Sequence, residues 1–139
     1  MFEARTLSVS IRRDARALYE AIWRPEIFPL WASGLSAAGL KREGESWAAQ
    51  GPDGPIRITF TGHNEFGVMD HRVELGGGRV VCVPMRVIAN GDGAEVMLTL
   101  FRQPWMTPEQ FAKDEAWVQR DLARLAELAT TAPAAGVQP

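Results

Sequence analysis

His71 is the residue whose type and setting best suit proton-transfer chemistry. In segment 68–75, Met69, His71 and Val73 fall on one face of a predicted strand, because successive side chains of a strand alternate. Since the two neighbours on that face are apolar, we expect the face to point inward. A neutral imidazole there could remove or return a proton. The alternative is a core histidine that is hydrogen-bonded to a backbone carbonyl.

Arg86 is the second catalytic candidate, on a valine-rich strand predicted over residues 79–89. Both faces of that strand are largely apolar, so alternation leaves open which face points inward. An inward guanidinium could hold a carboxylate or an enolate oxygen. The alternatives are a solvated arginine, or one paired with an acid of the closing helix. Asp114, Glu115 and Asp121 lie near the apolar stripe of that helix, where they are proton-transfer groups, partners of Arg86 or solvated flanking residues.

Aromatic and apolar side chains are candidates for contact with a ligand. The chain has five tryptophans in 139 residues, and each buries a large area and carries an N–H that needs a partner. A cavity lined by such rings would suit a flat hydrophobic molecule, although most aromatic residues simply pack in a core. The side chains expected to line such a site are Trp23, Trp31, Trp47, Phe60, Met69, His71, Met85, Phe111, Val118 and Leu122.

No motif in the sequence indicates a metal or a cofactor, and we expect neither. His63 and His71 are separated by a predicted turn at residues 65–67, which argues against a shared metal site. The glycines at 76–78 lack the following helix and lysine of a phosphate-binding loop, so they predict a turn. A Gly-x-Ser-x-Gly motif, typical of serine hydrolases, does not occur.

The elements that position these residues follow from hydrophobic periodicity. Apolar residues recur at helical spacing from Thr107 to about Ala129, which predicts a long closing helix. Short glycine-rich turns between the preceding strands favour an antiparallel meander. The predicted elements are a strand over 2–13, helices over 15–24 and 26–31, strands over 38–43, 46–50, 56–64, 68–75, 79–89 and 94–102, and the closing helix.

Composition and length predict one domain over residues 1–129, followed by a disordered tail over 130–139 that is rich in small residues and prolines. The net charge of −2 argues against a nucleic-acid partner. Cys82 is the only cysteine, so we expect no internal disulfide and a cytoplasmic location. The first residues do not resemble a signal peptide, and no stretch is apolar enough to be expected to span a membrane.

The order and spacing of several segments resemble the START-related superfamily, which includes plant pollen allergens and polyketide cyclases. The resemblance covers about residues 2–129, and it extends to small bacterial polyketide-cyclase-like proteins. It implies an α+β helix-grip fold, in which a curved antiparallel sheet of about seven strands wraps around a long C-terminal helix, with two short helices after the first strand. The segments that carry it are Val9-Ser10-Ile11 with the helix that follows, Pro29-Leu30-Trp31, residues 67–71, residues 83–87 and the helix over 114–125.

This resemblance implies a ligand cavity between the concave face of the sheet and the closing helix. The expected function is therefore binding of a small hydrophobic or aromatic molecule that is polyketide- or lipid-like, with cyclase or dehydratase activity as in some members. The alternative is a protein-interaction module, similar to a chaperone co-factor or a ribosome-associated toxin, without a small-molecule ligand. A monomer and a homodimer are both compatible with a small domain that has an open sheet edge.

Overall fold

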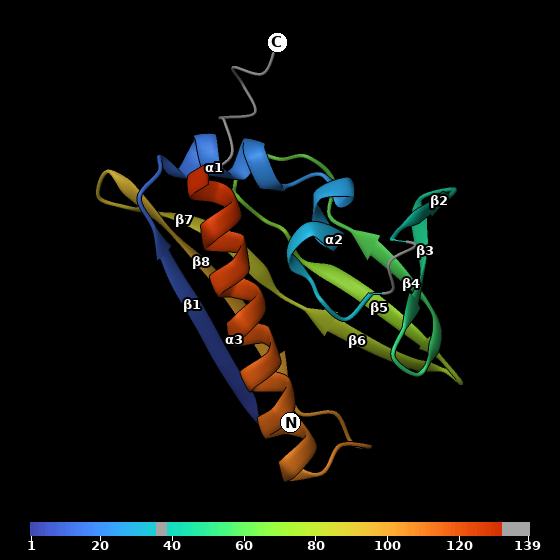
Figure 1. The fold of residues 1–139 in the computed structure, drawn as a ribbon. Helices are drawn as coiled ribbons and strands as arrows, with labels where there is room; N and C mark the ends of the chain where they lie inside the picture. Colours follow the sequence, from blue (N-terminus) through green and yellow to red (C-terminus); the bar gives the residue numbers. More distant parts are fainter. Residues whose placement is uncertain (36–38, 132–139) are drawn as a thin grey trace.

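A computed structural model describes residues 1–35 and 39–131 of the chain. Its elements are β1 Ala4–Ile11, α1 Ala15–Ile22, η1 Pro25–Ile27, α2 Phe28–Trp31, β2 Lys41–Glu43, β3 Ser46–Gly51, β4 Gly54–Phe60, β5 His71–Gly76, β6 Arg79–Val83, β7 Met85–Asn90, β8 Gly93–Phe101 and α3 Pro108–Thr131. The strands form two antiparallel sheets, of three strands in the order β1-β8-β7 and of five in the order β2-β3-β4-β5-β6. In Figure 1, α3 lies along the three-stranded sheet, and α2 lies between α3 and the five-stranded sheet.

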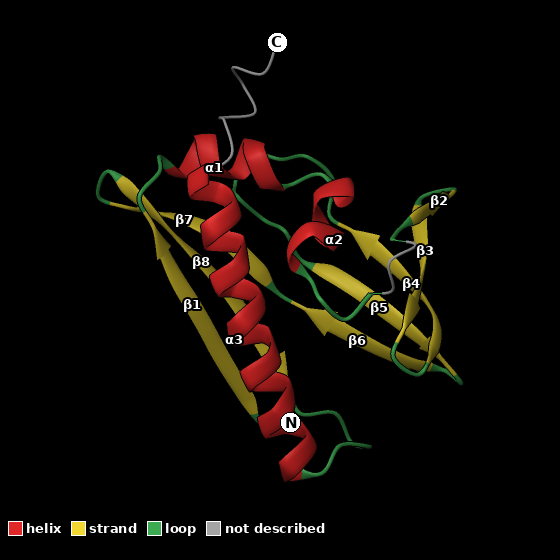
Figure 2. Ribbon diagram, viewed as in Figure 1, coloured by secondary structure: helices red, strands yellow, loops and turns green. Residues whose placement is uncertain are grey.

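The predicted α+β fold is confirmed, and Pro84 explains the one difference in strand count. Proline has no backbone N–H to donate, so it interrupts the strand predicted over 79–89 and separates β6 from β7. Figure 2 shows this break between the two sheets. The Pro84 carbonyl still accepts a hydrogen bond from Thr99 N at 3.0 Å. The described part of the chain has eight strands. If β6 and β7 are counted as one interrupted strand, the number is the predicted seven.

A second connection between the sheets shortens the strand that was predicted over 68–75. Val68 forms an isolated bridge with Arg86, and Met69 N donates to the Met85 carbonyl at 2.8 Å. These residues therefore pair with the three-stranded sheet, while β5 of the five-stranded sheet starts only at His71. The loop before β5 thus fixes the position of His71 relative to both sheets.

The helix boundaries follow from local capping. Asp14 accepts a hydrogen bond from Ala17 N at 3.0 Å and caps α1. At the start of α3, Thr107 Oγ1 accepts from Gln110 N at 3.1 Å, and Gln110 Oε1 accepts from Thr107 N at 2.8 Å, which is a reciprocal capping box. Two short helices follow β1, as predicted, although the second consists of a 3₁₀ turn, η1, joined to α2.

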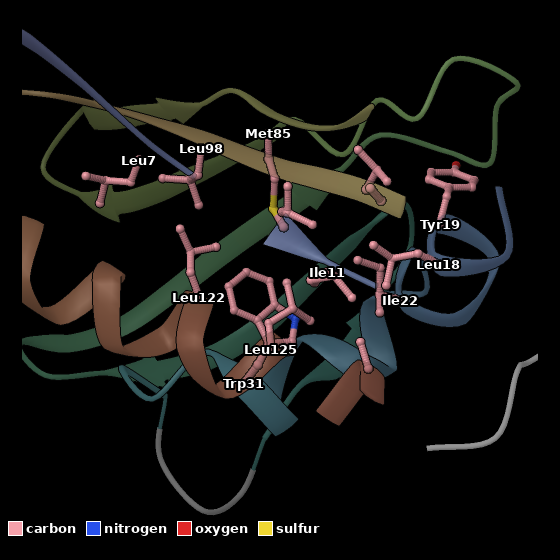
Figure 3. Packing of buried hydrophobic residues seen from close by; sticks show 14 of the residues in the cluster. Leu7, Ile11, Leu18, Tyr19, Ile22, Trp31, Met85, Leu98, Leu122 and Leu125 are labelled. Carbon is pink, nitrogen blue, oxygen red and sulfur yellow. The ribbon is translucent and has the colours of Figure 1, made fainter. Parts of the chain in front are cut away.

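The main core lies between α3 and the three-stranded sheet. Leu122 and Leu125 of α3 are fully buried and belong to the same cluster as Leu7, Leu98 and Trp31. Figure 3 shows these side chains directed toward one another from the helix, the strands and α2. Because the C-terminal half of α3 provides most of these contacts, that half anchors the helix on the three-stranded sheet.

The inner face of the five-stranded sheet presents a separate row of apolar residues. Trp47 pairs with Ile58, which pairs in turn with Val73 on the next strand. In the neighbouring row, Phe60 pairs with His71. The main core does not cover this inner face, because α3 packs principally on β1 and on α2.

The last helix is slightly longer than predicted. α3 continues to Thr131, two residues beyond the predicted end at Ala129. The rest of the predicted tail, residues 132–139, lies outside the described residues, as do residues 36–38 at the start of the strand predicted over 38–43. Within the described ranges, no helix is both long enough and apolar enough to cross a membrane.

Candidate functional site

Four aromatic rings meet where α2 covers the inner face of the five-stranded sheet. Phe28 begins α2, and its ring centroid lies 5.1 Å from that of Trp31, 5.2 Å from that of Phe60 and 5.2 Å from that of His71. The three pairs are edge-to-face, which is a favourable arrangement of aromatic rings. Phe28 therefore fills the space between the helices and the sheet at its centre.

His71 lies at the base of this aromatic cluster and is only 7% exposed. Its Nδ1 is 3.1 Å from the Met69 carbonyl oxygen. A carbonyl can only accept, so Nδ1 carries the proton and Nε2 keeps a lone pair. Burial lowers the pKa of His71, against the opposing effects of the Met69 hydrogen bond and the Asp70 charge. The ring is therefore a neutral base at neutral pH.

The space beside His71 is too small for an organic ligand. It measures about 10 Å³ and is lined by Trp31, Phe60, Met69 and Met85 among others. That volume is at the lower limit for one water molecule, far below that of a site for a drug-sized ligand. The indole N–H of Trp31 is buried without a hydrogen-bond partner among the described residues. The expected enclosed cavity around His71 is thus filled by side chains.

A larger space lies on the other side of Phe28, between the N-terminal half of α3 and the five-stranded sheet. We call it the α3 groove, and its volume is about 270 Å³. The sheet contributes the inner-face residues Ile56, Ile58 and Val73, and α3 contributes Val118 and an indole. The full lining is Phe28, Ala32, Gly34, Leu35, Pro52, Ile56, Ile58, Val73, Asp114, Trp117, Val118 and Asp121. The groove is therefore apolar except along one side of α3.

A hydrogen-bonded network fixes that polar side. Asp121 Oδ1 accepts from Ser33 Oγ at 2.7 Å and from Ser33 N at 3.3 Å. Trp117 Nε1 donates to Ser33 Oγ at 2.5 Å. These bonds join α3 to the segment after α2, and they hold the Trp117 ring at the edge of the groove. Asp121 is 8% exposed, so it is buried and not a solvated flanking residue.

Two carboxyl groups of the groove have raised pKa values. Burial raises the pKa of Asp121, although the Ser33 hydrogen bonds and the charges of Arg120 and Arg124 oppose this effect. Partial burial also raises the pKa of Asp114, two helical turns earlier on the same face. In both cases removal from water disfavours the charged form of the carboxyl group.

A second pocket of about 380 Å³ opens on the opposite side of the aromatic cluster. Trp23, Trp47 and Phe60 line it together with His63. His63 Nε2 lies 2.8 and 2.9 Å from the two carboxylate oxygens of Glu20. This pair connects α1 to the loop before β5. The second pocket is more polar than the α3 groove, because arginine and glutamate side chains contribute to its rim.

The structure places Arg86 away from all of these spaces. Its side chain is 45% exposed, and its guanidinium forms an ion pair with Asp70 at 2.9 Å. Arg86 pairs with Met97 of β8, whereas the neighbouring Met85 and Val87 are buried in the core. Alternation thus directs Arg86 to the outer face, so the inward orientation that its proposed catalytic role required is not the one observed.

The predicted ligand-contacting residues are divided among several environments. Val118 lines the α3 groove, Trp23, Trp47 and Phe60 line the second pocket, and Trp31, Met69, His71 and Met85 surround the small space. Phe111 and Leu122 are buried and line none of these spaces, so their expected contact with a ligand is not supported.

Several residues of the groove were missed because sequence patterns gave them another role. Ile56 and Ile58 share one face of an alternating strand, but an aliphatic residue on such a face looks the same in a core and in a groove. Asp121 was expected near the stripe of α3 without evidence of burial. Its partner Ser33 is 88 residues away in sequence, so no local pattern connects the two.

Comparison with known structures identifies the fold. No protein-family model and no curated protein matches the sequence. A START superfamily protein from Mycobacterium smegmatis matches with a TM-score of 0.69 at 9% identity, covering 91% of this chain and 97% of that one. XoxI from Bacillus cereus matches with a TM-score of 0.71 at 13% identity, covering 92% of this chain and 96% of that one. The chain has the helix-grip fold of the START-related superfamily.

DynU16, a protein encoded in the dynemicin biosynthetic locus, shares the helix-grip fold. It matches with a TM-score of 0.68 at 19% identity, and the match covers 95% of this chain but 49% of DynU16. In the present helix-grip protein, the space between sheet and closing helix is the α3 groove, at the position where a cavity was expected. The structure differs from the expected enclosed cavity because α2 divides the interior. The available space is therefore a groove.

Proposed function

We propose that the protein binds a small hydrophobic molecule with an aromatic or branched aliphatic body in the α3 groove. The observation that carries this proposal is the composition of the groove, in which residues of β4, β5, α2 and α3 present apolar side chains to one space of about 270 Å³. Ligand sites are typically concave and mostly apolar, with a few placed polar groups. The START-like fold supports hydrophobic ligand binding in general.

The size of the groove favours one compact ring system over an extended lipid. Its volume of about 270 Å³ is just below the usual range for small-molecule sites, which begins at about 300 Å³. The Trp117 ring, held by Ser33, offers a flat surface against which an aromatic ligand can stack. A polyketide-derived or similar aromatic molecule is therefore the preferred class.

Binding is a better-supported function than cyclisation or dehydration. His71 is the base that such a reaction would use, but the Phe28 ring lies between it and the groove, 5.2 Å from the imidazole. Proton transfer needs a donor and an acceptor within hydrogen-bonding distance. A cyclase or dehydratase step at His71 would therefore require Phe28 to leave its position in the aromatic cluster.

Fluorescence titration with groove-blocking variants tests the proposal. The indole of Trp117 lines the groove, so a bound aromatic molecule is expected to change its emission. In the variant Val118→Trp the larger side chain occupies the groove, and we expect affinity for small aromatic probes to fall at least about tenfold, equivalent to about 1.4 kcal/mol. Gln119→Trp adds the same indole at the next, exposed position, and it should bind as the wild type does.

Two results would contradict the proposal. One is equal loss of affinity in the Val118→Trp and Gln119→Trp variants, because that would show a general effect of an added indole. The other is the failure of every aromatic and aliphatic probe in the panel to bind the wild-type protein. Circular dichroism and thermal melting of both variants establish that each is folded before affinities are compared.

A further inference from the structure

The polar side of the α3 groove carries negative charge, and no cationic side chain is among the described residues that line it. Asp121 and Asp114 line the groove, and the other described lining residues include no arginine, lysine or histidine. Asp121 Oδ1 is engaged by Ser33, while its Oδ2 makes no hydrogen bond to another residue that the structure describes. Neither carboxylate forms an ion pair with a described residue.

The basic side chains that flank Asp121 on α3 do not line the groove. Arg120 and Arg124 flank Asp121 on α3 and contribute some positive potential. Arg124 Nε donates to the Leu30 carbonyl at 2.8 Å, and neither arginine lines the groove. An incoming cation would therefore reach the Asp121 carboxylate from the groove without displacing an existing ion pair.

The surroundings make this charge energetically important. A carboxylate that is 8% exposed beside apolar walls loses much of its hydration, and a buried charge is costly unless it is paired. A cation in the same space would compensate that cost through a charge-assisted hydrogen bond. An anionic molecule would increase it, because like charges would then share a poorly hydrated site.

The two carboxylates lie on one face of α3, and both residues line the groove. Seven residues of an α-helix correspond to a rise of about 10 Å, so Asp114 and Asp121 lie on one face about two turns apart along the helix axis. Asp121 is buried, whereas Asp114 is the more exposed of the two. Asp114 thus attracts a cation toward the groove, and Asp121 can receive it beside the apolar walls.

We infer that the ligand of the α3 groove is an amine, in which an aromatic body packs on the apolar walls and a protonated nitrogen donates to Asp121. This inference rests on the proposed function, since it specifies the chemical class of the molecule that occupies the groove. It predicts selection by charge among molecules with the same aromatic body.

Three indole probes that differ in charge test the inference. Tryptamine carries a protonated amine, tryptophol carries a neutral hydroxyl group, and indole-3-propionate carries a carboxylate on a comparable side chain. With the wild-type protein near pH 7 and at low salt, we expect tryptamine to bind at least about tenfold more tightly than tryptophol, equivalent to about 1.4 kcal/mol. Indole-3-propionate should bind most weakly. Isothermal titration calorimetry measures all three affinities.

Matched variants assign the preference to the groove. Asp121→Asn keeps an oxygen acceptor for Ser33 and removes the charge, so tryptamine affinity should fall about tenfold while tryptophol affinity changes less than about twofold. Glu115→Gln removes the same charge from a neighbouring residue of α3 that does not line the groove, and it should retain the preference for tryptamine. Asp114→Asn should weaken tryptamine binding by a smaller factor, because Asp114 is more exposed.

The outcomes separate this inference from the proposed function. Equal binding of tryptamine and tryptophol by the wild type would overturn the inference and leave hydrophobic binding intact. Equal loss of tryptamine affinity in Asp121→Asn and Glu115→Gln would also overturn it, because the preference would then arise from overall charge. Failure of all three probes and of the wider panel would overturn the proposed function and the inference together.

Discussion

At the scale of single residues, Asp121 links the stability of the fold to the chemistry of the groove. One oxygen of its carboxyl group is hydrogen-bonded to Ser33, and the residue lines the largely apolar groove. Most buried acids are paired with a base, which lowers their pKa. Burial instead raises the pKa of Asp121. Ionisation of this carboxyl group therefore costs free energy in the absence of a ligand.

The raised pKa predicts a defined effect of pH on stability. The folded protein holds the Asp121 proton more tightly than the unfolded chain, whose carboxyl has its ordinary pKa of 3.8. The contribution of the protonated Asp121 carboxyl to the stability of the fold is therefore complete below about pH 3.8. This contribution is lost as pH rises through the raised pKa. Asparagine cannot ionise, so Asp121→Asn should gain stability relative to the wild type across this window. Urea unfolding between acidic and neutral pH measures the difference.

Glu95 provides a control of opposite sign. Hydrogen bonds from Ser10 and Asn90 lower its pKa below the ordinary 4.5. Its stabilising effect is therefore present above pH 4.5 and is lost as pH falls through the lowered pKa. Glu95→Gln should consequently lose stability relative to the wild type as pH rises. Parallel pH profiles for wild type and Asp121→Asn would contradict the assignment of a raised pKa to Asp121.

At the scale of elements, the second connection between the sheets, which leads into β5, contains a glycine that packs closely against β7. Gly67 has φ +68°, and its carbonyl accepts a hydrogen bond from Val87 N at 2.9 Å. A Cβ at this position would lie 2.2 Å from the Val87 carbonyl oxygen, which is backbone and cannot move aside. The segment that leads into His71 is thus held against β7 by an approach that only glycine permits.

Replacement of this glycine should therefore disrupt the connection. We expect Gly67→Ala to lower the free energy of unfolding by about 2–4 kcal/mol, from backbone strain together with the steric clash. Gly62→Ala is a matched control in the same loop, because its Cβ would meet no atom within 4 Å and its φ is not positive. That control should change stability by less than about 0.5 kcal/mol. Equal effects in the two variants, measured by urea denaturation, would contradict the structural role of Gly67.

The sequence predicted these elements better than it predicted the site. Alternation correctly assigned His71 to the inner face, since that face of the strand is apolar and the other is charged. Alternation could not orient Arg86, because both faces of its strand are apolar. The division of the interior was not predictable, because it depends on Phe28 of α2 packing against Phe60 and His71, which are distant in sequence. Hydrophobic periodicity identifies apolar faces, but it does not show whether they enclose a core or a groove.

At the scale of the whole molecule, α3 has two halves with different roles. Leu122, Leu125 and Ala129 in the C-terminal half are buried against the main core. The N-terminal half contains Asp114 and Val118 over the groove, and much of its remaining surface is exposed. One helix thus combines a rigid anchor with a wall of the candidate site. Such a division is expected to produce unequal local stability along the helix.

Hydrogen exchange tests this division and its connection to binding. In the free protein, amides of residues 119–129 should exchange more slowly than those of residues 112–118, because the buried residues Leu122, Leu125 and Ala129 all lie in the former range. Saturating tryptamine should slow exchange in residues 112–118 and in β4 and β5 around Ile58 and Val73, which form the opposite wall of the groove. The pairing of β1 with β8 should be unaffected, since these strands lie outside the groove. The Val118→Trp variant should show no such ligand-dependent protection. Protection spread evenly over all elements, or confined to the second pocket near Trp47, would place the ligand elsewhere.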